Sequence, residues 1–419
     1  MVRVAMIEYF TTSSNTLIFL VKKGMAEPMI VEAGGDVLGQ PVTKESLLQC
    51  AGRLIVDFHG LPRDWDSDSR FERYKRLLSL PPAVNAGKRT KEILQINLKK
   101  PAFAYELTYW ENLSDVLLPA ELRTEIADSD LLCFVPHGPL HSLPFAALRW
   151  SEREYLIERF GICHVPSASI LRYCQSKNRR RMPDLYHQPS NYLIVAVAAG
   201  NEDPQDFEAD GEQLADLFRE ENESARVTSL VGTSKTGSTH PASKVLLQDA
   251  VTRQDVIHLA CHGLFGVERN SGDPLDSALL VSDGIAALSL HEASSLSPAE
   301  VSAHFLTARE VFDLELTADL VTLRACSSGR AEVETGDELI GLTRAFLYAG
   351  ASSLIVSLWN VNKRSSQLLL NDFYRLWLDK QHPLPKWQAL QQAQKNLLRN
   401  PEYQHPYHWA PFILVGDWV

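Results

Sequence analysis

The pattern of apolar and polar positions changes several times along the chain, and the N-terminal part has the pattern of a β-sheet. The runs VRVAMIEYFT and NTLIFLVKK are rich in β-branched and aromatic residues and are separated by the turn residues TSSN. They predict a β-hairpin, to which MIVEAG adds a third strand. Over residues 44–55 the apolar positions return at helical spacing, which predicts a helix. Residues 60–105 are charged and marked by prolines, which favours loops and surface helices.

Longer apolar runs begin at about residue 106. The segment 113–126 has a helical pattern, in which Pro119 opens a new first turn. DLLCFVPHG predicts a buried strand, and a second strand ends at Pro166. SASILRYCQS predicts a short helix, whereas residues 177–190 are polar, basic and proline-bearing, which predicts a linker or exposed loop.

After residue 190, apolar runs alternate with amphipathic segments. We expect strands in YLIVAVAA, ARVTSLVG, DVIHLACHG, SALLVSDG, DLVTLRACSSG, SSLIVSLWNV and FILVGDW, and helices over 209–220, 244–251, 307–312, 338–348, 365–378 and 386–398. Strands that are apolar throughout are typical of a parallel sheet covered by helices on both faces. The predicted fold class is therefore α/β, an α/β/α sandwich with a mostly parallel sheet.

The amino-acid composition excludes some classes of function. The 419 residues suffice for two or three structural units. The net charge of −11 argues against a dedicated nucleic-acid binder, although it leaves room for a local basic patch. Arg3 and Glu8 come too early for a secretory signal, and the uncharged run 345–362 is interrupted by Gly350, so we expect no membrane segment. The six cysteines are scattered and form no CxxC pair, which favours a reducing cytoplasm.

Two strand ends carry candidate chemistry. His262 and Gly263 follow the run IHLAC, and Cys326 follows VTLRA. In an open parallel sheet, functional groups lie past the carboxyl ends of the strands, so a thiol and an imidazole can meet there. The imidazole can then favour the thiolate and protonate a leaving amine. The backbone N–H groups of Gly263 and Cys326 are natural oxyanion donors. By spacing alone, however, such a cysteine is more often an inert core residue.

Several motif blocks resemble one family. DVIHLACHGLFG, LRACSSG, GDELIGLTRAFLYAGASSLIVSLWNV and HWAPFILVGD resemble, in order, the blocks of the CHAT domain, a caspase- and separase-like cysteine peptidase module. The stretch DLLCFVPHGPLHSLPFAAL and the opening hairpin look like the family's N-terminal half. The resemblance implies a caspase-like sandwich, with His262 as general base and acid, Cys326 as nucleophile and no cofactor or metal.

The resemblance also implies a division into three parts. These are an N-terminal hairpin and helical region (1–105), an upstream pseudo-caspase-like half (106–190) and a caspase-like catalytic domain (191–419).

A substrate pocket is implied around Arg324, because the residue two before the nucleophile helps to line it in related peptidases. On a strand, residues 324 and 326 point to the same face. A guanidinium favours a carboxylate, so we expect an acidic or neutral residue before the cleaved bond. Separase-like members that cut after basic residues carry an acid shortly after the strand tryptophan, whereas this chain has Asn362 and Lys363. The alternative, at about equal weight, is that Arg324 pairs internally, for example with Asp337 or Glu338.

Ser357 and Trp359 alternate on the strand that, in the family, runs beside the bound peptide. Both are therefore candidate substrate contacts together with Asn362, although Trp359 is as readily an ordinary core residue. Cys261 should lie on the opposite strand face from His262, buried and inert. His258 and His262 are four apart on a strand with no evident third ligand, so a metal site is not expected.

The predicted function is that of a regulated cysteine endopeptidase that cleaves one or a few partner proteins. Family members in bacteria are linked to defence and cell death, so the resemblance favours an effector activated by a sensor or regulatory protein. The long polar loops 232–243, 266–277 and 289–304 are candidates for gating the cleft. The rival hypothesis is an inactive scaffold that keeps the fold for binding.

Overall fold

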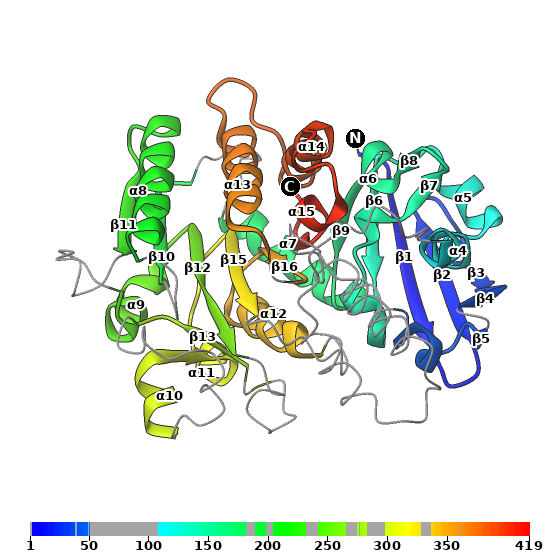
Figure 1. The fold of residues 1–419 in the computed structure, drawn as a ribbon, viewed down its shortest axis with the longest axis horizontal. Coiled ribbons are helices and arrows are strands. Elements are labelled where there is room, and N and C mark those ends of the chain that lie inside the picture. Colours follow the sequence, from blue (N-terminus) through cyan, green and yellow to red (C-terminus); the bar gives the residue numbers. More distant parts are fainter. Residues whose placement is uncertain are drawn as a thin grey trace, which may run out of the picture. The chain divides into compact units, whose positions relative to one another are not determined.

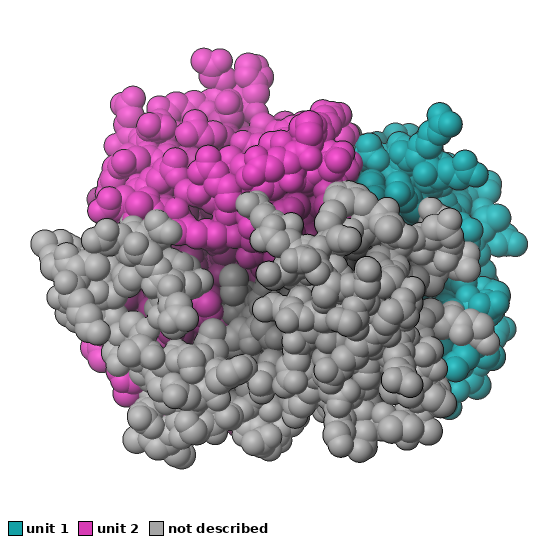
Figure 2. Space-filling view, viewed as in Figure 1, with its two compact units in different colours: residues 1–132, 136–160, 329–337 teal, residues 133–135, 161–328, 338–419 magenta. Residues whose placement is uncertain are grey.

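The computed structural model describes residues 2–37, 40–48, 50, 108–181, 189–197, 204–231, 242–264, 275, 277–282, 298–327, 337–359 and 361–419. They form two compact units, coloured separately in Figure 2. Unit 1 comprises residues 1–132, 136–160 and 329–337, and unit 2 comprises residues 133–135, 161–328 and 338–419. These units are defined by packing, whereas the three-part division at residues 105 and 190 rests on family resemblance and stays a prediction.

Unit 1 is built on the predicted hairpin. Strands β1 (Val4–Thr11), β2 (Thr16–Lys22) and β3 (Met29–Glu32) pair antiparallel in chain order, which confirms all three expected strands. Alternate residues of β1 are buried, and the Tyr9 hydroxyl donates a hydrogen bond to the Leu117 carbonyl at 2.9 Å. The other unit 1 elements are β4 (Asp36–Val37), β5 (Gln40–Pro41), α4 (Thr108–Leu117), α5 (Ala120–Ile126), β7 (Arg149–Ser151), β8 (Glu154–Tyr155) and α6 (Leu156–Arg159).

Unit 2 contains a large, mostly parallel sheet (Figure 1). Its strands are β9 (Gly161–His164), β10 (Asn191–Ala196), β11 (Arg226–Val231), β12 (Val256–Leu264), β15 (Leu320–Ser327), β16 (Ser353–Ser357) and β17 (Phe412–Gly416). They lie in the order β11-β10-β12-β15-β16-β17-β9. The first five are parallel, and β17 is antiparallel to β16. The strand β6 (Leu131–Val135) begins in unit 1 and ends in unit 2.

Helices cover both faces of the unit 2 sheet, which confirms the predicted α/β/α class. Strand alternation sends odd-numbered residues of β12 and β15 into the main apolar core, with residues from α7 (Ala168–Arg181), α9 (Lys244–Ala250) and α12 (Asp337–Ala349). The even-numbered face lies under α8 (Pro204–Glu221) and α13 (Lys363–Leu378), which stand side by side in Figure 1. Further elements are β13 (Ala278–Leu280), α10 (Pro298–His304), β14 (Phe305–Thr307), α11 (Ala308–Phe312), α14 (Lys386–Arg399) and α15 (Pro406–Trp409).

Two predicted loops are partly helical instead. The loop expected over 177–190 is wrong for residues 177–181, because α7 continues to Arg181. Arginine, lysine and glutamine are good helix formers, and the chain meets its next proline only at residue 183. The loop expected over 289–304 likewise contains α10 in its last seven residues. In the helix expected over 44–55, residues 44–48 and 50 are helical and the others lie outside the described part of the chain.

Candidate active site

The candidate site lies where β12 and β15 extend past their neighbours. The two strands pair in parallel from Val256↔Leu320 to Gly263↔Ser327. On the outer side of β12, the ladder with β10 ends at Ala260. On the outer side of β15, the ladder with β16 ends at Leu323. The last residues of this central pair therefore project past β10 and β16 as a tip at the carboxyl edge of the sheet, flanked by β13 from Gly263 onward. Parallel α/β sheets carry their functional groups at this edge.

His262 and Cys326 are direct Cα partners at this tip. Directly opposed residues of a parallel pair share a face of the sheet, so the backbone register is the one that a thiol–imidazole pair requires. His262 is buried, at 6% exposure. The side chain of Cys326 lies outside the described part of the structure, so its roles as nucleophile and partner of His262 stay predictions.

The structure also places Cys261 and Gly263, the residues on either side of His262. Cys261 is buried in the apolar core with Leu259 and Leu323, as predicted. Gly263 pairs with Ser327 on one side and with Leu279 of β13 on the other. Its backbone is thus part of the sheet on both sides, and the assignment of its N–H group as an oxyanion donor stays a prediction.

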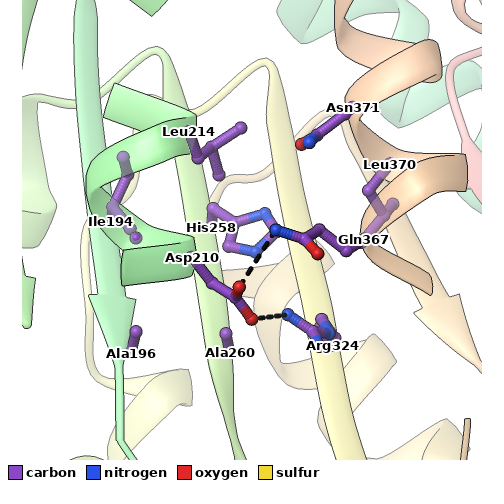
Figure 3. A pocket seen from close by; sticks show the side chains of 11 residues that line it. Ile194, Ala196, Asp210, Leu214, His258, Ala260, Arg324, Gln367, Leu370 and Asn371 are labelled. Atoms are coloured by element: carbon purple, nitrogen blue, oxygen red, sulfur yellow. Dashed lines mark hydrogen bonds and ion pairs between the residues drawn. The ribbon is translucent and has the colours of Figure 1, made fainter. Parts of the chain in front are cut away.

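Arg324 is bonded inside the protein (Figure 3). Its Nη1 atom lies 3.5 Å from Asp210 Oδ2, an ion pair with α8. Its Nε–H donates to Ser366 Oγ at 3.1 Å, and its Nη2–H donates to the Lys363 carbonyl at 3.3 Å, both on α13. Internal pairing of Arg324, which the sequence left open, is therefore confirmed. Its ion-pair partner in the described residues is Asp210. The side chains of Asp337 and Glu338, the partners suggested from the sequence, lie outside the described part of the structure.

Asp210 is the centre of this cluster. Its Oδ2 atom also lies 3.5 Å from Lys363 Nζ, and its Oδ1 atom accepts a hydrogen bond from Gln367 Nε2 at 3.0 Å. The carboxylate therefore connects α8 to α13 and to β15 at once. Sequence reasoning missed Asp210 because it is one of several acids on a polar, amphipathic helix. Only the packing of α8 against the even-numbered face of the sheet distinguishes it from the others.

A small cavity lies beside the ion pair, among Asp210, His258, Arg324, Gln367 and Asn371 (Figure 3). Its volume is about 20 Å³, which is room for a single water molecule. In this conformation the cavity is too small to admit a substrate side chain. Whether Arg324 contacts a substrate is thus untested, and such contact requires the surrounding side chains to move.

Below the tip, a buried hydrogen-bonded group joins the two central strands to α13. The Tyr374 hydroxyl lies 2.7 Å from Thr322 Oγ1 and 3.1 Å from His258 Nδ1. Burial, followed by the nearby positive charge of Arg324, lowers the pKa of His258 to about 3. This histidine is consequently neutral at physiological pH. These hydrogen bonds were not predicted from the sequence, because a tyrosine on an amphipathic helix is usually an ordinary core residue.

The other predicted substrate contacts, Trp359, Asn362 and Ser357, are buried or hydrogen-bonded within the protein. Trp359 is buried, and its Nε1–H donates to the Tyr407 carbonyl at 3.2 Å, as the core alternative expected. Asn362 caps α13, with its side-chain oxygen accepting from the Ser365 N–H at 3.1 Å. Ser357 is buried at the end of β16, opposite Phe412. Contact of any of the three with a peptide stays a prediction.

The described residues contain neither a metal-ligand cluster nor a membrane-spanning helix. Nowhere in them do three or more histidine, cysteine or acidic side chains gather in a group that could hold a metal ion. No helix among them combines the length and apolar character that a membrane crossing needs.

Similar proteins of known structure include separase and gingipain R. Separase of Saccharomyces cerevisiae, in complex with securin, matches 99% of this chain and 30% of its own, with a TM-score of 0.49 and 11% identity. The Arg-specific cysteine proteinase gingipain R matches 76% of this chain and 68% of its own, with a TM-score of 0.44 and 9% identity.

Sequence comparison gives closer relatives. Tetratricopeptide repeat protein 28 of Homo sapiens is 31% identical over 307 residues, and that of Mus musculus is 30% identical over 306 residues. Each match covers 68% of this chain and only 12% of the relative. The sequence model of the CHAT domain matches residues 108–417, about three quarters of the chain. Because this match covers more than half of the chain, the chain belongs to the CHAT domain family.

Proposed function

We propose that this chain is a cysteine endopeptidase in which Cys326 is the nucleophile and His262 is the general base and acid. The observation that supports this most is the register that makes the two residues Cα partners at the projecting tip of β12 and β15. Membership of a family with a caspase-like peptidase fold supports it further. The activity itself is part of the proposal.

In the proposed reaction, His262 accepts the thiol proton of Cys326, and the thiolate forms a bond to the carbonyl carbon of the scissile peptide. The resulting oxyanion is stabilised by backbone N–H groups, for which Gly263 and Cys326 are the candidate donors. When the tetrahedral intermediate collapses, the C–N bond breaks and His262 protonates the departing amine. Water, deprotonated by the same imidazole, then hydrolyses the thioester and restores the thiol.

The proposed substrate is one or a few partner proteins with an acidic or neutral residue before the cleaved bond. Activation by a sensor or regulatory protein in the cytoplasm, as in a defence or cell-death effector, completes this proposal. It requires no cofactor, because the thiol and imidazole supply the nucleophile and the proton transfers.

A proteome-wide cleavage screen tests the proposal. The intact chain is compared with Cys326→Ala and His262→Ala, and Cys261→Ala is the matched control because it removes a neighbouring thiol that faces the apolar core. We expect new protein N-termini with the intact chain and with Cys261→Ala, and none with the other two variants. New termini that persist in Cys326→Ala would refute the assignment of the nucleophile.

A catalytically inactive interaction scaffold is the second candidate. The observation that favours it is that Arg324, Trp359 and Asn362, three of the expected substrate contacts, are all bonded within the protein. The name of the two sequence relatives, tetratricopeptide repeat protein 28, also describes a repeat and not a reaction. Under this alternative, the intact chain and Cys326→Ala give the same N-termini and bind the same partners.

A further inference from the structure

Arg324 is a buried cation, and a buried cation needs a partner. The guanidinium is 7% exposed, and removal of a charge from water is costly unless an anion and hydrogen bonds compensate it. Asp210 supplies the anion from α8, and α13 supplies Ser366 Oγ and the Lys363 carbonyl as acceptors. We refer to Asp210, Arg324, Lys363, Ser366 and Gln367 as the Asp210 cluster.

The cluster is placed where β15 loses its pairing with β16. The ladder between β15 and β16 ends at Leu323↔Val356 among the described residues. Arg324 is the next residue, and Cys326 follows two positions later on the same strand. Beyond Leu323, β15 is therefore held by its ladder with β12 and by the bonds from the Arg324 side chain to α8 and α13.

Asp210 determines how Arg324 is held. Its Oδ2 atom lies between Arg324 Nη1 and Lys363 Nζ, at 3.5 Å from each. Without the carboxylate, these two cations have no negative charge between them. Gln367 fixes the carboxylate from the other side through its hydrogen bond to Oδ1. Arg324, next to the tip of β15, is thus bonded to a residue far from it in sequence.

We propose that Asp210 is a positioning residue for the reaction: acting through Arg324, it holds the tip of β15 so that Cys326 stays opposite His262. This inference rests on the proposed function, since it concerns the geometry of the same nucleophile. It assigns to Arg324 a positioning role in place of direct reading of the substrate. It also makes α8 an element through which the reactivity of Cys326 is controlled.

The test measures the alkylation rate of Cys326 by iodoacetamide between pH 5 and 9, resolved by mass spectrometry, in Asp210→Asn, Arg324→Gln and the double variant. Asp216→Asn is the matched control, because Asp216 is on the same helix, 70% exposed and paired only with Arg219 in the described residues. We expect Asp210→Asn to slow alkylation by about 10- to 100-fold, the size of effect that small misplacements of a reacting group produce. The double variant should be no slower than Arg324→Gln, because both substitutions break one connection.

The sign of the effect separates positioning from simple charge. Loss of the Asp210 charge leaves the positive charges of Arg324 and Lys363 uncompensated. By charge alone, this would favour the thiolate of Cys326 and speed its alkylation at low pH. Positioning predicts the opposite, slower alkylation across the pH range. Faster alkylation in Asp210→Asn, additive losses in the double variant or an equal loss in Asp216→Asn would each overturn the inference.

The two proposals fail in different ways. If Cys326 in the intact chain reacts no faster than the other cysteines, the proposed function fails and this inference with it. If Cys326 is reactive but Asp210→Asn, folded by circular dichroism, leaves its rate unchanged, only the positioning role fails. Should Asp210→Asn not fold, Gln367→Leu removes one hydrogen bond to the carboxylate and keeps the charges. A smaller loss of rate is then expected, and an unchanged rate overturns the inference.

Discussion

Acidification should destabilise unit 2 through His258. The ring is buried, and its Nδ1 atom bonds the Tyr374 hydroxyl at 3.1 Å. Burial, followed by the charge of Arg324, lowers the pKa of this histidine to about 3, against an ordinary value of 6.5. Between these pH values the unfolded chain binds a proton that the folded chain does not. Stability is therefore lost as the pH falls from about 6.5 towards 3.

The magnitude follows from the size of the pKa difference. At pH 5, which is roughly 1.5 units below the ordinary pKa, protonation of the unfolded state costs about 2 kcal/mol of folding stability. His405 adds a second contribution of about the same size at this pH, because burial and then the charge of His408 lower its pKa to about 4. Asp319, whose pKa is raised mainly by burial, acts in the opposite direction.

The assay is urea unfolding at pH 7 and pH 5 for the intact chain, His258→Asn and His405→Asn. Asparagine keeps a polar atom near the position of the ring Nδ1, so it can still bond the Tyr374 hydroxyl or cap α15. We expect each variant to lose about 2 kcal/mol less than the intact chain between the two pH values. Equal losses in the intact chain and His258→Asn would show that this histidine is not held neutral by the fold.

Two further substitutions, each with a matched control, test a glycine backbone position and a buried ion pair. Gly350→Ala should lower the free energy of unfolding by more than about 3 kcal/mol, because the glycine has φ +132° and an added Cβ would lie 2.1 Å from a backbone carbonyl oxygen. Gly24→Ala, at φ +94° in open space, should cost only about 1 kcal/mol, and equal melting temperatures for the two would contradict this. Lys386→Met should cost about 3–5 kcal/mol at pH 7, because it leaves the buried Asp319, 2.9 Å away, without its cation. Because burial raises the pKa of Asp319, the loss should be smaller at pH 5; a loss independent of pH, or one matched by the exposed Lys380→Met, would refute the assignment.

The sheet was predictable because its strands are apolar throughout. A run such as VIHLA cannot leave either face in water, so its burial between two helical layers follows from the residues alone. The alternation of side chains then fixed Cys261 in the core and placed His262 on the other face. What the sequence could not supply is which strands are neighbours. The adjacency of β12 and β15, and with it the pairing of residues 262 and 326, comes from the structure.

The polar contacts beneath the site were not predictable, because they join elements far apart in the chain. Internal pairing of Arg324 was expected with acids close to it in sequence, whereas the described structure pairs it with Asp210 on α8. The reason is geometric: α8 covers the even-numbered face of β15, and residue 324 points to that face. Tyr374 similarly unites His258 and Thr322 from a helix whose sequence shows only amphipathic spacing.

The pairing of a thiol with an imidazole at the strand tips is tested most directly by alkylation of all six cysteines near pH 7, before and after His262→Gln. The five described cysteines, Cys50, Cys133, Cys163, Cys174 and Cys261, are buried and should react slowly in either protein. The account predicts that Cys326 reacts fastest in the intact chain and that His262→Gln slows this cysteine alone. A Cys326 rate that is no faster than the others, or that is unchanged by His262→Gln, would contradict it.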